Sequence, residues 1–176
     1  CEALSIRIEI HLSSGLPSCS PASLPGTAVR ESRERVRSAI INSGLEFLQR
    51  RITINLAPSD VLKDDARFGL AIAVSILAAS NQILAGILEH NEFVAELALD
   101  GSLRTVCTGI ATEVDCMRAG RDLIISSNSA GSACLVPDAR IGAAGNLRDV
   151  AAHLGEVETL PLCQPGHPMS ASLSLP

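Results

Sequence analysis

The side chains best placed to bind a ligand are four arginines in one predicted helix: Arg30, Arg33, Arg35 and Arg37. Guanidinium groups form paired hydrogen bonds with phosphates or with the carboxylates of a partner. Glutamates lie between these arginines. Glu31 can pair with Arg35 at spacing i,i+4, as on ordinary solvated helices. Glu34 can pair with Arg37 at spacing i,i+3. Three roles therefore stay open for this cluster: a solvated face, a contact with another subunit, or a contact with nucleic acid.

The sequence lacks the patterns of a phosphate-driven or proteolytic active site. A Walker A loop has the form GxxxxGK[ST], because a glycine-rich turn aims backbone N–H groups at the phosphates and a lysine reaches the β and γ phosphates. The only lysine, Lys63, follows no such turn, and a GxSxG nucleophile elbow is absent. Lys63 also lies among Asp60, Asp64 and Asp65, which favour its charged form and disfavour its use as the base of a Ser–Lys peptidase.

The cysteines and histidines do not have the spacing of a metal site. No two of the six cysteines form a CxxC pair, and the four histidines are scattered among them. A chain of 176 residues that is 47% hydrophobic can build a core without disulfides, so we expect free thiols that pack as small hydrophobic side chains. We therefore predict no catalytic, cofactor-binding or metal-binding residue in this chain.

The composition is typical of one soluble domain. The net charge is −5, so nucleic acid or an anionic membrane would have to bind a local basic patch. The chain has no Trp or Tyr, which disfavours base stacking on aromatic side chains. The most apolar segment, residues 70–79, is about half as long as a membrane span, and we find no signal peptide. These features predict a cytoplasmic protein with no membrane contact.

Hydrophobic periodicity predicts the elements of the first third of the chain. Alternating apolar and polar residues indicate strands over residues 4–12 and 52–56. Residues 13–25 are rich in Ser, Pro and Gly and indicate a loop, with a short strand around residues 20–24. A helix is expected over residues 27–42, with Arg30, Arg33 and Arg37 outward.

The rest of the chain mixes helices with strands. A helix over residues 70–80, apolar on nearly every side, should be buried. A strand over residues 93–99 should lead through a two-residue Asp100-Gly101 turn into a partner strand over residues 103–106. The remaining predicted elements are a helix carrying Ile110, Val114 and Met117 and ending at Gly120, a strand over residues 123–126, and a helix over residues 146–154.

The predicted fold class is α/β (or α+β), a mixed sheet with packed helices. One domain should cover residues 1–155. Residues 156–176 hold four prolines and many serines without periodicity, which predicts a linker or a disordered tail.

Several long strings of the sequence carry a resemblance to a known family. They cover residues 15–17, 24–37, 41–44, 52–58, 67–68, 76–80 and 96–104, and they include LPGTAVRESRERVR and ELALDGSLR. In this order they closely resemble the N-terminal domain of the ComM (also YifB) family, bacterial magnesium-chelatase-like AAA+ proteins. The resemblance covers roughly residues 4–155. Several strings in fixed order are more specific than any short motif.

The resemblance implies a fold shared with the C-terminal domain of Lon protease and with a domain of a ribosomal small-subunit protein. In such a Lon-type domain, the nucleophile position falls near Gly69 and the lysine position near Ile110, and neither residue can do Ser–Lys peptidase chemistry. The family also implies an AAA+ module that binds ATP and Mg²⁺, and this module is missing here, which suggests a fragment.

The expected role is that of a non-catalytic accessory domain in a homo-hexamer that acts on DNA, by branch migration during natural transformation. Two alternatives stay open. One is a motor-subunit domain of a Mg-chelatase-type metal-insertion complex, and the other, disfavoured, is a Lon-type peptidase domain.

Overall fold

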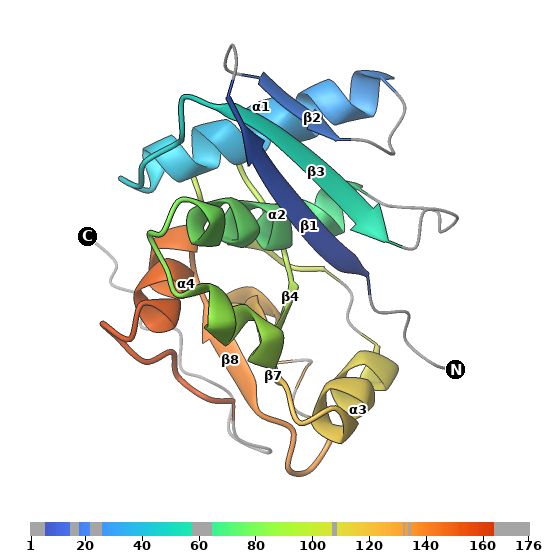
Figure 1. Ribbon diagram of the computed structural model, residues 1–176. Coiled ribbons are helices and arrows are strands. Elements are labelled where there is room, and N and C mark those ends of the chain that lie inside the picture. The colour runs from blue at the N-terminus through green and yellow to red at the C-terminus, as the bar shows by residue number, and fades with distance from the viewer. Residues whose placement is uncertain are drawn as a thin grey trace, which may run out of the picture.

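The computed structural model describes residues 6–14, 18–21, 26–57, 65–106, 109–131, 133 and 135–163. Figure 1 shows two layers, each built on a three-stranded sheet, with the helix α2 (Asp65–Ala79) between them. We call residues 6–57 the N-terminal layer and residues 85–163 the C-terminal layer. The predicted α/β class with a mixture of sheets and helices is confirmed.

The N-terminal layer has a mixed sheet in the order β1-β3-β2. Its strands are β1 (Arg7–Ser13), β2 (Ser18–Pro21) and β3 (Arg51–Ala57). β1 is antiparallel to β3 and β2 is parallel to it. Ile8 lies opposite Leu56 and Ile10 opposite Ile54, so the period-2 alternation places the apolar side chains of both strands on one face. The two long predicted strands are confirmed, and the short one begins two residues earlier than expected.

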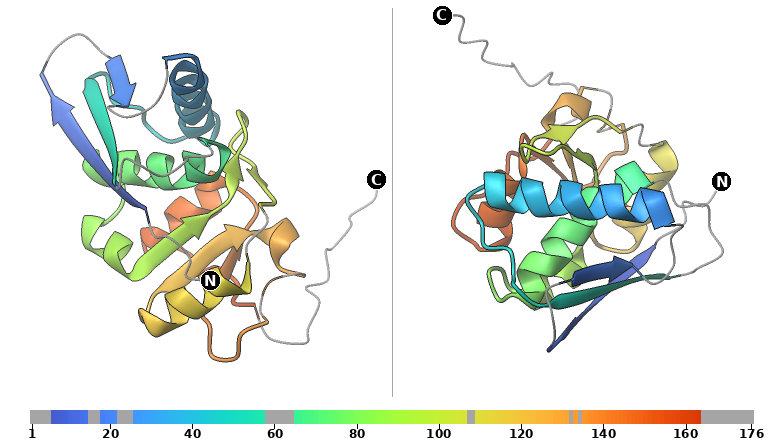
Figure 2. Two further views of the ribbon diagram at one scale, coloured as in Figure 1. Left: turned by 90° about the vertical axis from the view of Figure 1, so that its right-hand side faces the viewer. Right: turned by 90° about the horizontal axis from the view of Figure 1, so that it is seen from above.

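The helix α1 (Gly26–Asn42) and α2 lie on the apolar face of this sheet (Figure 2). The predicted bounds of α1 are confirmed, and Gly44 follows its end with a φ of 74°, which glycine adopts without steric cost. α2 begins five residues before the predicted start. Its middle is buried on both sides, as its all-round apolar sequence predicts.

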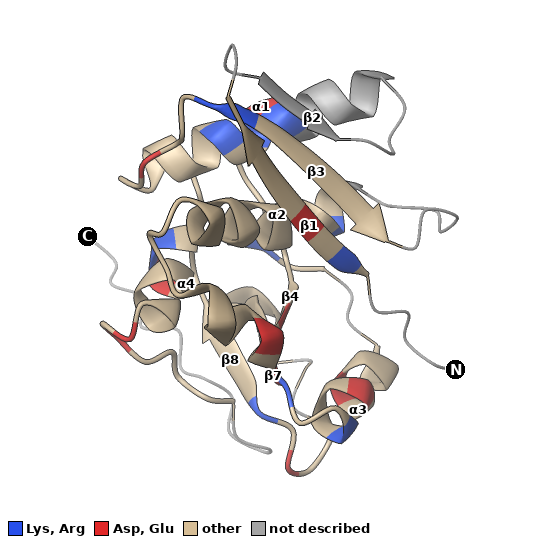
Figure 3. Cartoon of the chain, viewed as in Figure 1, with Lys and Arg blue, Asp and Glu red and all other residues tan. Residues whose placement is uncertain are grey.

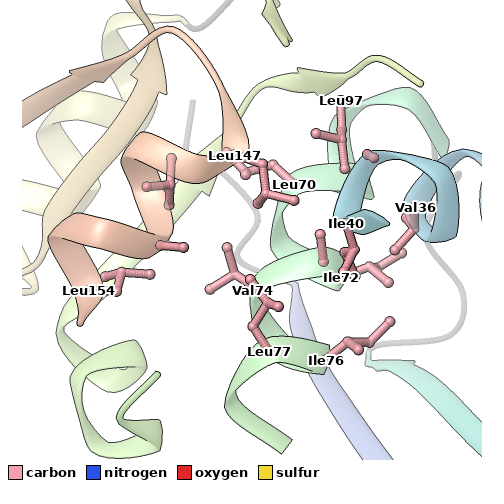
Figure 4. Close-up of a cluster of buried hydrophobic side chains, with 14 of the residues drawn as sticks. Val36, Ile40, Leu70, Ile72, Val74, Ile76, Leu77, Leu97, Leu147 and Leu154 are labelled. Carbon is pink, nitrogen blue, oxygen red and sulfur yellow. The ribbon is translucent and has the colours of Figure 1, made fainter. Parts of the chain in front are cut away.

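α2 carries the contacts that join the two layers (Figure 4). On one side, Val74 and Leu77 approach Leu154 of α4 (Leu147–Leu154). On the other side, Ile72 lies near Ile40 of α1. One continuous hydrophobic cluster therefore runs through both layers.

The C-terminal layer contains a parallel sheet in the order β4-β7-β8. Its strands are β4 (Asn91–Val94), β7 (Asp122–Ser126) and β8 (Ile141–Ala144). The 3-10 helix η1 (Ala85–His90) precedes β4, and η2 (Ser127–Ser129) follows β7. The predicted strand over 123–126 and the last helix are confirmed, and the Asn146 side chain caps α4 by accepting the N–H of Asp149 at 2.9 Å. β8 was not predicted.

The segment predicted as one strand over 93–99 splits at Ala95. Its first part is β4, and its second part, β5 (Glu96–Leu97), pairs with β6 (Leu103–Arg104) in a separate hairpin. The predicted two-residue turn is wrong. Gly101 N–H donates to Ala98 O at 3.0 Å, and within this loop only Gly101, with a φ of 88°, has a left-handed backbone conformation. The strands are therefore joined by a three-residue loop that ends in a β-bulge.

This hairpin bridges both layers. Asn42 Nδ2 at the end of α1 donates to Leu99 O at 2.8 Å. From the other layer, Leu147 N–H donates to Gly101 O at 2.8 Å and Ser126 Oγ donates to Leu103 O at 2.8 Å. The hairpin is therefore hydrogen-bonded to α1, to β7 and to the start of α4.

The helix α3 (Ile110–Arg118) is confirmed, with Gly120 at a φ of 65° after its end. Its apolar spacing does not mark its buried side. Ile110 is 55% exposed, whereas Glu113 and Cys116 are buried. Glu113 Oε2 accepts the N–H groups of Leu135 at 3.2 Å and Val136 at 3.3 Å. The buried Glu113 carboxylate therefore holds the loop at residues 135–136 against α3 by hydrogen bonds, in place of the apolar contact that the sequence pattern predicted.

The packed chain extends past the predicted boundary at residue 155. Leu160 and Cys163 are buried, and Cys163 N–H donates to Ile141 O of β8 at 2.8 Å. The part of the predicted tail up to residue 163 therefore covers the edge of the parallel sheet, and residues 164–176 lie outside the described residues. None of the helices in the described ranges is long and apolar enough to cross a membrane.

Candidate functional site

The arginine cluster of α1 does not form one face. Arg33 and Arg37 are four residues apart and share one side of the helix, whereas Arg35 lies on the other side, with Glu34 between them. Arg37 is exposed, and Arg33 and Arg35 are half-buried. Arg30 lies in α1, but its side chain is outside the described part.

Among the described residues of the layer, the three described arginines of α1 have no acidic partner. In the part of the chain that the structure describes, Arg33, Arg35 and Arg37 form no ion pair, so the predicted pairing of Glu34 with Arg37 is wrong. The predicted partner of Arg35, Glu31, has a side chain outside the described residues. Arg7, Arg50 and Arg51 are exposed in the same layer and are also without an ion pair among the described residues. Figure 3 shows these charges along α1 and at the ends of β1 and β3.

In the C-terminal layer, three of the arginines are paired with acidic side chains. Arg121 Nη1 lies 2.8 Å from Glu92 Oε1, and Arg140 Nη2 lies 3.0 Å from Asp122 Oδ2. Arg104 lies 3.7 Å from Glu96. Residues 1–57 contain seven Arg and five Glu, whereas residues 58–176 contain seven basic and fourteen acidic residues. The −5 net charge is therefore the sum of a basic part (+2) and an acidic part (−7).

The two Lon-type positions hold no catalytic group in the structure. Gly69 is buried in α2, and a Cβ atom there would lie 3.2 Å from Leu97 Cβ, which is tighter than ordinary side-chain contacts. Ile110 begins α3 on the surface. Lys63 lies outside the described residues.

A cleft that sequence reasoning missed lies at the amino edge of the parallel sheet. It has a volume of about 570 Å³. Its lining residues come from four stretches of the chain, 87–91, 120–122, 140 and 153–159: Ile87, His90, Asn91, Gly120, Asp122, Arg140, His153, Glu156 and Thr159. Asn91 and Asp122 are register partners at the starts of β4 and β7, and Arg140 directly precedes β8. No two lining residues form a recognisable motif, so only the fold brings these polar groups together.

Two buried thiols lie in the C-terminal layer. Cys116 and Cys163 are free and belong to one hydrophobic cluster, so for these two residues the prediction of free thiols packed as small hydrophobic groups is confirmed. Burial, together with the charge of Glu92 and a hydrogen bond to it, raises the pKa of Cys116 to about 12. The thiol is therefore kept neutral and unreactive. Among the described residues, no three His, Cys, Asp or Glu side chains gather as a metal site.

Comparison with known proteins identifies the family. The sequence model described as subunit ChlI of Mg-chelatase matches residues 8–129. The chain belongs to this family. The matched range runs from β1 to η2, so β8, α4 and four cleft residues (Arg140, His153, Glu156 and Thr159) lie beyond it.

Bacterial relatives narrow the resemblance. The chain is 48% identical over 149 residues to the uncharacterized protein YifB of Salmonella typhimurium, covering 85% of the chain and 29% of that protein. It is 44% identical over 161 residues to the competence protein ComM of Haemophilus influenzae, covering 92% of the chain and 32% of that protein. YifB of Escherichia coli is 44% identical over 140 residues, 76% of the chain and 28% of that protein. The resemblance to the N-terminal domain of the ComM/YifB family is confirmed, and the chain spans about a third or less of these relatives.

Proposed function

We propose that this chain is a non-catalytic accessory domain of a magnesium-chelatase-like, ComM-type AAA+ ATPase. ATP and Mg²⁺ would bind an AAA+ module outside these residues, because the chain has no Walker A loop. The assembled protein would be a cytoplasmic homo-hexamer that acts on DNA, by branch migration during natural transformation. The domain would supply a contact surface and no reacting group.

The similarity to a competence protein carries this proposal. The chain matches ComM along 92% of its own length but only 32% of the length of ComM, as expected of one domain in a larger machine. The basic N-terminal layer supports a role on DNA, since Arg33, Arg35 and Arg37 have no ion pair among the described residues and their guanidinium groups are free to meet phosphates.

The test uses the full-length protein with Arg33, Arg35 and Arg37 changed to Ala. DNA affinity should fall, and the slope of log K against log salt should become shallower by about one for each arginine that contacts a phosphate. Matched controls are Arg118→Ala and Arg148→Ala, which remove exposed arginines of the C-terminal layer. If DNA affinity, ATPase rate and hexamer formation all match the unaltered protein, α1 has no part in the mechanism.

The family description favours a second candidate, a motor-subunit domain of a Mg-chelatase-type complex. This candidate predicts that the full-length protein supports Mg²⁺ insertion into a porphyrin when chelatase partner subunits are added. A DNA-stimulated ATPase with no insertion activity would reject it. The Lon-type peptidase is disfavoured, because Gly69 and Ile110 offer neither nucleophile nor base, and absence of casein cleavage would remove it.

A further inference from the structure

We propose that β1 pairs with β1 of a second copy of this chain, so that the two N-terminal sheets join edge to edge across a two-fold axis. β1 is an edge strand: β3 lies on one side of it, and no described strand pairs with its other side. Figure 2 shows β1 at the outer margin of the sheet. An edge strand presents unpaired backbone N–H and C=O groups on which another strand can form a ladder. The pairing is independent of the proposed action on DNA.

The helices α1 and α2 leave the apolar side chains of β1 partly uncovered. Each of these side chains has a register partner in β3: Ile8 lies opposite Leu56, Ile10 opposite Ile54 and Leu12 opposite Ile52. Both rows lie on the same face of the sheet. The three β3 side chains are at most 3% exposed, whereas the three β1 side chains are only half-buried. A neighbouring strand would place its own apolar row against the row of β1 and remove both from water.

The two edges of this sheet differ in their protection against pairing. β2, at the other edge, has four residues and ends at Pro21, which has no N–H to donate. β1 has seven residues, and its register with β3 runs without a bulge from Arg7 to Ser13. It contains neither a proline nor a lysine. Short strands, prolines, lysines and bulges are the usual means of keeping an edge strand unpaired, so β1 is the open edge.

The sequence of β1 is complementary to itself in one antiparallel register. With the two-fold axis at Ile10, all seven residues pair, and Ile8 faces Leu12 of the second copy. Glu9 then faces His11 of the second copy, and the axis repeats this pair on its other side. Both side chains are exposed on the face of the sheet away from the helices. An imidazole N–H can therefore donate to a carboxylate oxygen at two places in the interface.

Other registers of the same two strands are less favourable. An axis at Glu9 or at His11 places identical side chains opposite each other. An axis at Ile8 pairs only residues 7–9 of β1, because the strand begins at Arg7. Glu9 also keeps a second carboxylate oxygen for a partner, because Asn55 Nδ2 donates to its Oε2, at 3.2 Å. The complementary charges and the length of the ladder therefore favour a second copy with the axis at Ile10.

The experiment measures self-association of the 176-residue chain by sedimentation equilibrium and by NMR at increasing protein concentration. A thiol reductant is present, because the chain has six cysteines. One strand pair is a small interface, so we expect a monomer–dimer equilibrium with a dissociation constant on the order of 0.1 mM. Amide shifts should change mainly at residues 7–13, and isotope-filtered NOEs should join residue 9 of one copy to residue 11 of the other.

Charge variants test the register. Glu9→Lys removes the acceptor on both sides of the axis and should weaken dimerisation about tenfold. A double variant, Glu9→His with His11→Glu, exchanges the two side chains and restores the pair, so its dissociation constant should return to within about twofold of the original value. Glu46→Lys makes the same change of charge at an exposed position in the loop after α1, and it should leave dimerisation unchanged.

Three results in the 176-residue chain would each overturn the proposal: a monomer at all concentrations, a dimer whose shifts lie in the C-terminal layer, or a double variant that dimerises as weakly as Glu9→Lys. So would slow hydrogen exchange, at every concentration of the full-length protein, of the β1 amides that face away from β3, because another segment of the same polypeptide would then occupy the edge. The DNA affinity of the α1 arginine variants tests the other proposal alone, so the two proposals fail separately.

Discussion

The two layers of this domain differ in how many of their arginines are paired. In the C-terminal layer, three of the five arginines, Arg104, Arg121 and Arg140, each face an acidic side chain within 3.7 Å, whereas Arg118 and Arg148 form no ion pair with a described residue. In the N-terminal layer, the described arginines have no ion pair with a described residue, although Glu34 lies next to Arg33 and Arg35 in the chain. Paired arginines contribute to holding a structure together, and unpaired arginines keep their hydrogen-bonding capacity for another molecule.

In a chain without a catalytic pattern, the pairing of charged side chains indicates which surface could bind another molecule. Net charge alone suggests a mildly acidic surface that repels nucleic acid. The distribution of charge instead separates a basic layer from an acidic one. The two parts hold the same number of basic residues, seven each, but residues 1–57 hold five acidic residues and residues 58–176 hold fourteen, so the number of acidic side chains makes the distinction.

The largest effect is expected from a substitution in α2, the helix that packs against both layers. Leu77 is fully buried and lies in the cluster that both layers share. Leu77→Ala should lower the free energy of unfolding by about 2–5 kcal/mol, since it leaves a cavity in this cluster. We expect one cooperative urea transition for both layers, because α2 belongs to both cores. Two resolved transitions would show that the layers are independent units.

A substitution at the hairpin tip should have the next largest effect. Gly101 has a φ of 88°, and a Cβ atom there would overlap Ser43 Oγ and lie 3.3 Å from Ala39 O at the end of α1. Gly101→Ala should therefore cost about 2–4 kcal/mol, combining left-handed strain with a wedge between the layers. Gly44→Ala isolates the strain, because its φ is 74° with no atom within 4 Å of the added Cβ, and it should cost about 1–2 kcal/mol. If both variants lower the free energy of unfolding by the same amount in chemical denaturation, the Cβ atom at residue 101 makes no steric clash with α1.

Alkaline pH should weaken the C-terminal layer through Cys116. Its folded pKa of about 12 lies above the ordinary value of 9.0, so the fold favours the neutral thiol. This contribution is fully present below pH 9 and is lost as the pH rises from 9 towards 12, by up to about 1.4 kcal/mol per pH unit. The chain has no Tyr and one Lys, but its five other thiols also titrate in this range, so the comparison with a Cys116 variant isolates this residue. Urea unfolding of Cys116→Val should show a flatter decline than the unaltered chain, and parallel curves would contradict the assignment.

Two arginine substitutions, one in each layer, compare the contribution of a paired and an unpaired arginine to stability. Arg121→Ala breaks the 2.8 Å contact with the partly buried Glu92 and should cost about 1 kcal/mol, after allowance for solvent screening. Arg37→Ala removes an exposed arginine without an ion pair among the described residues and should change stability by less than about 0.5 kcal/mol. Thermal or urea unfolding measures both. A larger cost for Arg37→Ala would mean that the N-terminal arginines are structural after all.

The smallest predicted effect lies in the hairpin loop. The Ser102 hydroxyl donates to Asp100 Oδ1 at 2.6 Å and its backbone N–H donates at 2.9 Å, and these bonds lower the pKa of Asp100. Ser102→Ala should raise the pKa of Asp100 towards its ordinary value without reaching it, since the backbone N–H remains. An NMR titration of the carboxyl carbon tests this, and an unchanged pKa would show that the Ser102 hydroxyl does not lower the pKa of Asp100.

Sequence patterns predicted the helices and strands that have one buried face, because their apolar residues recur at the regular spacing of a helix or a strand. β1, β3 and α1 each present a regular apolar stripe, and all three were found within a few residues of their expected bounds. β8, with the sequence IGAA, is buried at every position, so it has no alternation to detect. The segment around Ala95 (residues 93–99, FVAELAL) is apolar apart from Glu96 and gives no sign that the chain changes sheets there.

The candidate sites were harder to predict because they depend on tertiary contacts. The arginines of α1 were found from the sequence, but only the structure shows that Arg33, Arg35 and Arg37 form no ion pair with a described residue. The buried face of α3 was hidden because Glu113 is satisfied by the N–H groups of Leu135 and Val136, far along the chain. The cleft was invisible because Asn91, Asp122 and Arg140 become neighbours only when three parallel strands align.

The β5–β6 hairpin has a mechanical consequence. It is joined to α1 by the bond from Asn42 to Leu99, and to the parallel sheet and α4 by bonds from Ser126 and Leu147. A displacement of α1 relative to the parallel sheet would therefore strain several of these hydrogen bonds at once, which links the position of one layer to that of the other.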